Sequence, residues 1–398
     1  MFQLPVHLKE AFKNFPDLKE KYSDYSSLTT GSLHYLTYAG LTGHGMLYVM
    51  FFMFTTTAKL IRKIRFETFI HTHHLYVLFY TFLFLHSFGC FFRSPGGECK
   101  GYNTKYYIAP VFLFFLIDRM IRVYRSREDT HISDVIIHAG KVVELRFEKP
   151  SMIYNPGQYL YINIPEISKF QWHPFTISST PQEGFISVHI KVVGDWTGAL
   201  YNIVNSSKNQ FPSIRVDGPF GAPAQDLFRY ETSVLVSAGI GVTPSAGLLK
   251  SVWYAYMRKA PMKLKKLHLI WVCRDMQDIA CFQSLLYTME ENIPASFVDS
   301  QIYLTGKLGS TDIANIMYNE SNDKFDQITQ LRSKTLFGRP QWEKIFESIK
   351  DEINPVKKKN EVGIFFCGPP VMGEALKKQA NRSSTKFCKF IIHEENFE

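Results

Sequence analysis

The sequence predicts a multidomain protein with three kinds of structure in order along the chain: membrane-spanning α-helices, an antiparallel β-barrel, and an α/β domain with a parallel sheet. Three apolar stretches lie in the first third of the 398 residues. Short alternating runs separated by turn residues follow, and from about Glu231 strand and helix patterns alternate. We therefore predict an extracellular segment over 1–34, a transmembrane region over 35–127, a barrel over 128–226 and an α/β domain over 227–398.

Composition limits the possible functions. A chain of 398 residues is long enough for two or three domains. The formal charge of +9 could indicate a nucleic-acid or a membrane-surface partner. Several basic residues cluster directly beside apolar stretches, where the positive-inside rule expects them, so we predict contact with membrane lipid and no nucleic-acid partner. The six cysteines form no CxxC pair, which indicates neither a disulfide framework nor a zinc site.

The apolar stretches begin at Tyr35, Phe66 and Tyr106, and each is close to the roughly 20 residues that cross a bilayer. Basic clusters lie at residues 59–65 and 119–127. Placing both clusters in the cytosol puts the start of the chain outside and everything after the third stretch inside. The alternative is three buried helices of a soluble protein.

The loop over 87–105 would then lie outside the membrane, where Cys90 and Cys99 could pair or remain free thiols. The first 34 residues are charged and contain proline, so they do not resemble a cleavable signal peptide.

The second stretch contains HTHHLYVLFYTFLFLH, with four histidines among apolar residues. Ionisable side chains within a membrane are costly, so a functional role is the first hypothesis. His73 and His86 are 13 residues apart, a rise of about 20 Å along a continuous helix. This spacing suits two stacked haems with one axial imidazole each. His71 and His86 are closer in angle around such a helix, and histidines bonded to neighbouring helices or water are the alternative.

Two motifs lie in the barrel region. HPFTISST begins at His173, and a turn with hydroxyl groups is by itself a weak indication of function. KVVGDWTGAL begins at Lys191 and places Gly194, Asp195, Trp196 and Thr197 at the start of a predicted helix. A helix N-terminus beside a lysine suits a phosphate, although a simple N-cap at Asp195 or Thr197 is equally compatible.

Two further motifs lie at predicted strand ends of the α/β domain. VLVSAGIGVTP runs from a strand through Gly239 and Gly241 to a helix opened by Thr243 and Pro244. Glycines permit close approach of a pyrophosphate, but the third glycine of the dinucleotide fingerprint is missing. FFCGPP contains Cys367 at a strand end, where parallel sheets bind ligands. A buried structural thiol is the alternative for this cysteine.

The order of motifs is more specific than any one of them. HPFT, GDWT, DGPFG, SAGIGVTP, WVCRD, GRPQW, FFCGPP and a terminal NFE follow one another along the chain. This series closely resembles the transmembrane NADPH oxidase family, of the ferric-reductase superfamily, from about Gly40 to Phe397. The resemblance implies a ferredoxin-reductase-like pair, with the barrel at 128–226 binding FAD and the α/β domain at 227–398 binding NADPH. No EF-hand pattern is present.

The resemblance also implies roles for single residues. His173, Pro174, Phe175 and Thr176 would line FAD, with the Thr176 hydroxyl near its reactive edge. Lys191 and the turn formed by Gly194, Trp196 and Thr197 would hold the FAD pyrophosphate. The residues implied for the nicotinamide nucleotide are Gly239, Gly241, Thr243, Pro244, Cys367, Gly368 and Pro369, with Arg274 and Arg339 gripping the 2′-phosphate. Cys367 would lie beside the nicotinamide, and Phe397 would cover the flavin until nicotinamide displaces it.

In the membrane region, 35–127, His73 and His86 resemble the family's axial haem ligands. The implied activity is electron transfer from cytosolic NADPH through FAD and two b-type haems to molecular oxygen, producing superoxide at the plasma membrane. Some family members need cytosolic activators and a small membrane subunit. Each haem takes its second imidazole from a helix that would precede Met1, so we expect an N-terminally incomplete sequence or a truncated form. His34 and His44 are expected to be interfacial or packing residues.

Other functions remain open at this point. A ferric- or cupric-chelate reductase would use the same arrangement, although the short outer loop contains no metal-binding cluster. A truncated chain could act only as a diaphorase or as a non-catalytic partner of a full-length oxidase. Glu398 follows the predicted terminal aromatic and departs from the family pattern.

Overall fold

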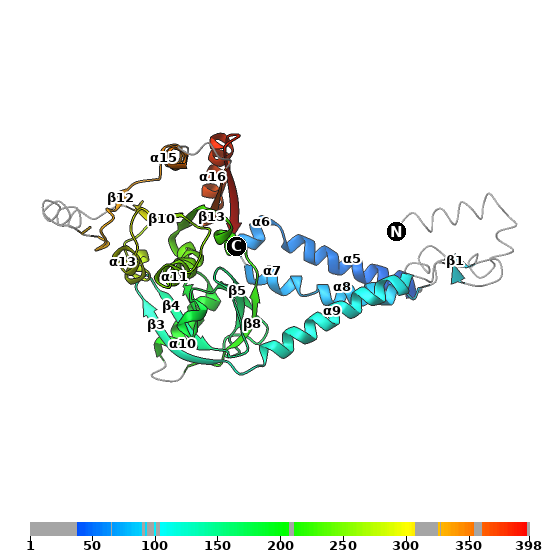
Figure 1. Ribbon diagram of the computed structural model, residues 1–398. Helices are drawn as coiled ribbons and strands as arrows, with labels where there is room; N and C mark the ends of the chain where they lie inside the picture. Colours follow the sequence, from blue (N-terminus) through cyan, green and yellow to red (C-terminus); the bar gives the residue numbers. More distant parts are fainter. Residues whose placement is uncertain are drawn as a thin grey trace. The chain divides into compact units, whose positions relative to one another are not determined.

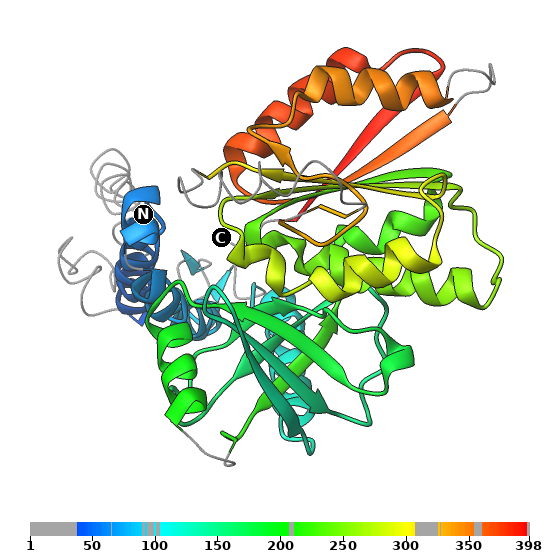
Figure 2. The ribbon, with the colours of Figure 1, turned by 90° about the vertical axis from the view of Figure 1, so that its left-hand side faces the viewer.

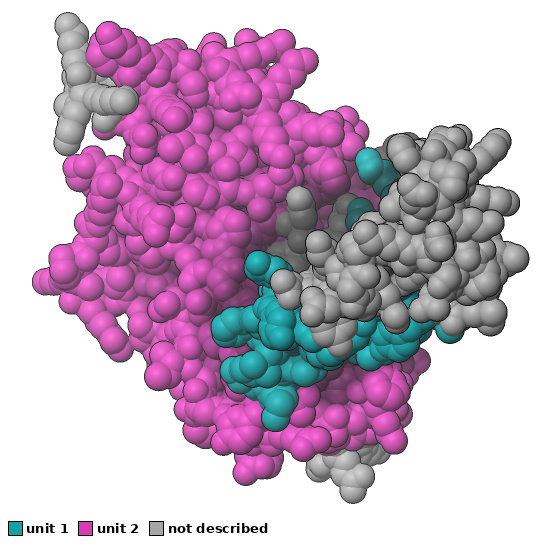
Figure 3. Space-filling view, turned by 90° about the vertical axis from the view of Figure 1, so that its right-hand side faces the viewer, with its two compact units in different colours: residues 1–122 teal, residues 123–398 magenta. Residues whose placement is uncertain are grey.

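The computed structural model describes residues 38–64, 66–89, 92–93, 99–100, 104–206, 211–306, 325–326, 328–353 and 360–395. The chain divides into two compact units, Met1–Arg122 and Val123–Glu398, which are coloured separately in Figure 3. Three parts of the sequence-based predictions lie outside the described residues: the segment 1–34 that was predicted to be extracellular, Cys90 and Phe397.

The first unit is helical. Its elements are α5 (Tyr38–Thr56), α6 (Lys59–Ile64), α7 (Phe66–His73), α8 (Tyr76–His86), the short antiparallel pair β1 (Phe92–Arg93) and β2 (Cys99–Lys100), and α9 (Thr104–Ser126), whose end extends into the second unit. Close packing of α5 on α8 depends on glycine, because a Cβ on Gly45 would lie 2.9 Å from the Phe82 ring. None of the helices in the described ranges combines the length and the apolar composition that a bilayer crossing requires.

The predicted continuous helix through the four histidines is wrong, because α7 ends at His73 and α8 begins at Tyr76. The His74 Nδ1 atom lies 2.6 Å from the carbonyl oxygen of Ile70, which is also bonded by the backbone of the turn. The amides of Leu75 and Val77 bond to carbonyls three residues earlier rather than four. A side chain that competes for a backbone carbonyl, with tighter turns beside it, interrupts a helix. The separation of about 20 Å that was predicted for His73 and His86 assumed one continuous helix, so it does not apply to two separate helices.

The second unit begins with six antiparallel strands in two sheets, as predicted for the barrel region (Figure 1). One sheet has the order β3 (His131–His138), β4 (Val142–Glu148), β7 (Ile186–Lys191), and the other β6 (His173–Thr176), β5 (Tyr159–Asn163), β8 (Arg215–Phe220). The strands alternate apolar and polar residues, and their apolar faces, with Trp196 and Leu200 of α10 (Asp195–Ser206), form one core. Two 3₁₀ turns, Pro181–Glu183 and η2 (Pro223–Arg229), complete this region, and the predicted boundary at 226/227 falls within η2.

The rest of the second unit is the predicted α/β domain with a wholly parallel sheet. The strand order is β12 (Leu336–Phe337), β11 (Val298–Leu304), β10 (Lys266–Cys273), β9 (Thr232–Ala238), β13 (Asn360–Cys367), β14 (Cys388–Glu395). On one face lie α11 (Thr243–Met257) and α13 (Gln283–Asn292), and on the other α15 (Trp342–Ile353) and α16 (Pro370–Ser383), as Figure 2 shows. The short elements η3 (Gly239–Val242) and α12 (Gln277–Ala280) follow β9 and β10. Both faces are covered, which explains the continuous apolar runs of the central strands.

Candidate functional site

The candidate nucleotide site lies where the strand order reverses. From β9 the chain builds the sheet outward through β10, β11 and β12, and it then returns to place β13 on the other side of β9. Helices leave β9 and β13 on opposite faces of the sheet, so a crevice opens beyond their carboxyl ends. Open α/β sheets bind their ligands at this kind of switch point. The two motifs predicted at strand ends, SAGIGVTP and FFCGPP, meet here.

Two glycines form the turn after β9. Gly239 has a φ of +52°, which a side chain would strain, and a Cβ there would meet no atom within 4 Å. Gly241 is constrained by packing instead, because a Cβ would lie 2.6 Å from the carbonyl oxygen of Cys367. The structure therefore brings together two motifs more than a hundred residues apart in sequence. The open space above Gly239 is suited to a ligand that contacts backbone.

The helix predicted after this turn begins where the sequence indicates. α11 starts at Thr243 with Pro244 in its first turn, where proline is favoured. The Thr243 hydroxyl donates to the Ile240 carbonyl at 2.7 Å and closes the turn. First-turn amides and the helix dipole attract an anion, so this end of α11 can hold a phosphate.

Cys367 ends β13, beside Ser237 of β9 and Glu395 of β14. Burial raises the pKa of its thiol to about 12. The group is therefore a neutral thiol near pH 7, suited to packing against a ligand and not to nucleophilic attack. The next residue is Gly368, where a side chain would not fit because its Cβ would lie 2.9 Å from the Ala238 Cβ. Pro369 is the N-cap of α16.

Glu395 is a candidate functional residue that sequence reasoning missed. It ends β14, where its Oε1 atom accepts a hydrogen bond of 3.2 Å from the Ala224 amide. Burial raises the pKa of its carboxyl to about 7. It lines a small pocket with Pro244 and Cys367. In the sequence, Glu395 comes directly before the terminal NFE motif. The resemblance assigned a role in that motif to Phe397 and none to the acidic residue before it.

The HPFT motif forms β6, paired with β5 through contacts such as Thr176 with Tyr159 and Pro174 with Tyr161. The ring of Trp196, from the start of α10, lies 4.4 Å from the His173 ring and 5.9 Å from the Phe175 ring, measured between centroids. The structure thus joins the two predicted barrel motifs into one aromatic cluster.

Two polar atoms of this cluster, His173 Nε2 and Trp196 Nε1, are buried without a hydrogen-bond partner among the described atoms. Burial lowers the pKa of His173 to about 4, so the imidazole is neutral near pH 7. Unpaired buried polar atoms are uncommon in proteins, and a ligand with acceptor groups would satisfy them. The aromatic cluster therefore fits a flavin nucleotide.

The residues predicted to hold the FAD pyrophosphate lie at the end of β7 and the start of α10. α10 begins at Asp195, and Cβ atoms on Gly194 or Gly198 would meet open space. However, the Thr197 hydroxyl accepts from the Val193 and Gly194 amides at 3.0 Å each, so it serves as a local cap. The Lys191 ammonium lies 2.6 Å from Asp278 of α12 and links the barrel to the α/β domain.

Arg274 and Arg339 lie beyond the carboxyl ends of β10 and β12, which are separated by β11 alone. Both side chains are exposed. Two guanidinium groups at the sheet edge that carries the glycine turn could contact an anionic part of the same nucleotide.

The two predicted haem ligands lie in the first unit. His73 lines a pocket of about 280 Å³ whose other lining residues are mostly apolar: Met50, Met53, Phe54, Thr57 and Phe79. The Nδ1 atom of His86 lies 2.9 Å from the Thr42 hydroxyl, a contact of the kind that orients a ligating imidazole. His44 Nδ1 lies 2.8 Å from the Gly40 carbonyl oxygen, in agreement with a packing role.

Comparison with known proteins agrees with this geometry. Residues 127–224 match a family model described as an FAD-binding domain, and residues 230–381 match the ferric reductase NAD binding domain. A superoxide-generating NADPH oxidase heavy chain from Dictyostelium discoideum is 37% identical over 94% of this chain and 73% of its own length. NADPH oxidase 1 from Rattus norvegicus is 34% identical over 90% of this chain and 69% of its own. A ferredoxin NADP+ reductase structure from Neisseria gonorrhoeae has a TM-score of 0.48 and 13% identity, covering 67% of this chain and 97% of that chain.

The comparisons thereby confirm the family that the motif series predicted. Both relatives exceed 30% identity, and the match extends over more than two thirds of each of them. The chain belongs to the NADPH oxidase family.

Proposed function

We propose that this chain carries electrons from NADPH through FAD and haem to molecular oxygen, with superoxide as the product. The observation that carries the proposal is the meeting of Gly241 and Cys367 at the carboxyl edge between β9 and β13, in a chain of this family. Bound FAD would supply the conversion of two-electron to one-electron transfer, and bound haem would supply one-electron transport.

On the flavin side, His173, Pro174, Phe175 and Thr176 would line FAD. The His173 and Trp196 nitrogen atoms would gain the partners that they lack among the described atoms. Gly194 and Thr197 would present the start of α10 to the pyrophosphate. The Lys191 ammonium would contact that phosphate while it also keeps its ion pair with Asp278.

On the nicotinamide side, the turn of Gly239 and Gly241 and the helix start at Thr243 and Pro244 would bind the pyrophosphate. Cys367, Gly368 and Pro369 would flank the nicotinamide with a neutral surface. Glu395, with a pKa of about 7, can hold or release a proton beside the transfer site near neutral pH. Arg274 and Arg339 would select NADPH over NADH through the 2′-phosphate, and Phe397 would cover the flavin.

In the first unit, His73 and His86 would hold haem b. Its surface carries many large exposed apolar side chains, among them Tyr107 at 78% and Phe114 at 72% exposure. Large exposed apolar surfaces indicate contact with lipid or with another protein. We propose that this unit is embedded in the plasma membrane and that the dehydrogenase unit lies in the cytosol. Binding of cytosolic activators and of a small membrane subunit stays a prediction.

The test is a reduced-minus-oxidised absorption spectrum of the 398-residue chain in membranes, with NADPH added anaerobically. Reduction of a haem b signal, followed by NADPH-dependent superoxide on the opposite side once oxygen is admitted, is the expected result. Flavin bleaching without a haem signal would leave a diaphorase, whereas reduction of ferric chelate in preference to oxygen would identify a metal reductase.

A matched pair of variants tests the haem assignment. His73→Ala should abolish part of the haem signal and leave flavin reduction intact. His74→Ala removes the neighbouring imidazole, which lies against the Ile70 carbonyl, and should retain the signal. Equal loss in both variants would contradict the role of His73.

A further inference from the structure

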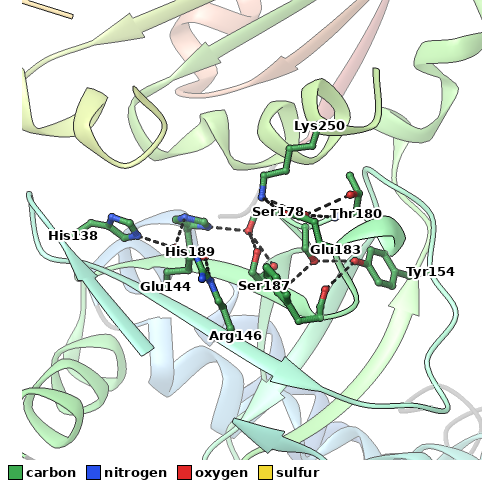
Figure 4. Close-up of polar contacts among 12 residues, drawn as sticks. His138, Glu144, Arg146, Tyr154, Ser178, Thr180, Glu183, Ser187, His189 and Lys250 are labelled. Carbon is green, nitrogen blue, oxygen red and sulfur yellow. Dashed lines mark hydrogen bonds and ion pairs between the residues drawn. The ribbon is translucent and has the colours of Figure 1, made fainter. Parts of the chain in front are cut away.

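Outside the nucleotide site, three potential metal ligands come together on one sheet of the barrel (Figure 4). His138, Glu144 and His189 come from β3, β4 and β7, and Glu144 is directly paired with His189 in the strand register. One ligand atom from each residue lies within 4.8 Å of the other two. Nothing in the proposed electron-transfer function uses this cluster.

The carboxylate is held so that one oxygen points to both imidazoles. Arg146 Nε donates to Glu144 Oε1 at 2.7 Å. The other oxygen, Oε2, lies 2.8 Å from His138 Nε2 and 3.5 Å from His189 Nε2. Arg146 thus fixes the Glu144 carboxylate on one side, and the Oε2 atom faces both imidazole rings.

The second nitrogen of His189 has a polar neighbour that can orient the ring. His189 Nδ1 lies 2.8 Å from the Ser178 hydroxyl, which also lies 2.8 Å from the Ser187 hydroxyl and 3.0 Å from the Ser187 carbonyl oxygen. When Ser178 directs its proton to Ser187, it accepts a hydrogen bond from His189 Nδ1–H, and Nε2 then carries the lone pair that a metal ion requires.

With this tautomer, His189 Nε2 presents a lone pair to Glu144 Oε2. The side chain of His189 is only 4% exposed and that of Glu144 only 6%. The Glu144 Oε2 and His189 Nε2 atoms lie 3.5 Å apart, and a cation between them would be attracted by both. His138 adds a third donor atom and is 20% exposed, which provides access from solvent.

We propose that His138 Nε2, Glu144 Oε2 and His189 Nε2 bind a divalent transition-metal ion of the zinc class, with water in the fourth position. Zinc takes histidine nitrogen and carboxylate oxygen at about 2.0 to 2.2 Å, so tetrahedral ligand atoms lie roughly 3.3 Å apart. The 3.5 Å separation is close to that value. The 2.8 Å contact between His138 Nε2 and Glu144 Oε2 is a hydrogen bond, which the ion would replace once His138 carries its proton on Nδ1.

The surroundings match those of known metal ligands. Ser178 orients His189 through its second nitrogen, and Arg146 orients the carboxylate through its second oxygen. The positive charge of Arg146 weakens the attraction for a dication, so we expect moderate affinity. The His189 ring also lies 4.5 Å from the ring of Phe282, measured between centroids, so the ion would stiffen the barrel where it contacts the α/β domain.

The test uses Zn²⁺ and Co²⁺ with the purified 398-residue chain after chelator treatment. We expect one equivalent of Zn²⁺ to bind and to raise the unfolding temperature, and Co²⁺ to give the visible absorption of a tetrahedral site. Zinc X-ray absorption should detect two histidine nitrogens and one carboxylate oxygen. A sulfur ligand, or no saturable binding, would overturn the proposal.

Variants separate this site from other histidines of the chain. His138→Asn should weaken Zn²⁺ binding by at least about tenfold, since even the loss of a supporting partner has an effect of that size. His131→Asn alters an exposed histidine of the same strand and serves as the matched control. Ser178→Ala leaves all three ligands in place and should weaken binding less than His138→Asn. If His138→Asn and His131→Asn bind Zn²⁺ equally well, the site lies elsewhere and the proposal is wrong.

Discussion

The sheet edge of the α/β domain and the HPFT face of the barrel are built differently. At the sheet edge, backbone and small residues form the candidate site, and a Cβ added to Gly241 would lie only 2.6 Å from the Cys367 carbonyl oxygen. On the barrel face, the rings of His173, Phe175 and Trp196 form it. The comparison teaches that a site made of backbone tolerates no added atom, whereas a site made of aromatic side chains depends on burial and on individual polar atoms.

The largest expected difference between the two regions is in the sign of their pH dependence. The pKa of Glu395 is raised from 4.5 to about 7, so its contribution to stability is fully present below pH 4.5 and is lost as pH rises to 7. The pKa of His173 is lowered from 6.5 to about 4, so its contribution is present above pH 6.5 and is lost as pH falls to 4.

Glu395→Gln should therefore gain about 3 kcal/mol of unfolding free energy relative to the parent chain between acid and neutral pH. His173→Gln should gain about 2 to 3 kcal/mol relative to the parent chain on acidification. Urea unfolding at several pH values measures both effects, with the exposed residues Glu374 and His131 as control positions. If the unfolding free energies of the two variants changed with pH in the same direction relative to the parent chain, the opposite pH dependence of the two regions would be contradicted.

Gly241→Ala tests the backbone-built site. Its Cβ would lie 2.6 Å from a carbonyl oxygen, so the β9 turn or the end of β13 must move. We expect a loss of about 2 kcal/mol in stability and at least a tenfold rise in the KM for NADPH. Gly239→Ala meets no atom but requires a positive φ, and should cost about 1 kcal/mol in stability. Stopped-flow flavin reduction measures the NADPH dependence, and unchanged kinetics in Gly241→Ala would contradict the assignment.

Trp196→Phe tests the aromatic site. It removes the buried Nε1–H group and leaves a small cavity, so we expect a loss of about 1 to 2 kcal/mol in stability and roughly tenfold weaker FAD binding. Trp253 of α11 has a similarly buried Nε1 atom without a partner among the described residues, and Trp253→Phe is the matched control. FAD titration by fluorescence measures the effect. If Trp196→Phe and Trp253→Phe weakened FAD binding equally, the effect would reflect lost packing and not a contact of Trp196 with FAD.

The smallest effect is expected at the ion pair between Lys191 of β7 in the barrel and Asp278 of α12 in the α/β domain. Asp278→Asn removes the ion pair with Lys191, which is 30% exposed, so the stability should fall by only about 0.5 kcal/mol. FAD binding should tighten severalfold, because the Lys191 ammonium is then free to contact phosphate. Glu183→Gln, which disrupts the pair with Lys250, is the control and should leave FAD binding unchanged. Weaker FAD binding in Asp278→Asn would instead make Asp278 a residue that positions Lys191.

The barrel strands, the parallel sheet and the start of α11 could be predicted because their signals are local. Alternation of side chains, glycine turns and a proline in the first helical turn act over a few residues. The helix break at residues 74 and 75 could not be predicted, because it depends on the contact of His74 with the Ile70 carbonyl oxygen, and a histidine can equally bond to solvent or to another helix. The carboxyl group of Glu395 was missed for a related reason: its burial is set by β13 and η2, not by its neighbours in sequence.

The family, the antiparallel strands and the parallel sheet could be predicted from the sequence, since they depend on motifs and on local conformational preferences. The roles of the nucleotide-site residues stay predictions. It took the tertiary structure to place Gly241 so close to Cys367 that no Cβ fits, to pair Lys191 with Asp278, and to bring His138, Glu144 and His189 together. Such contacts depend on which strands become neighbours, a choice that is made by burial of apolar surface over the whole domain. Local patterns carry little information about it.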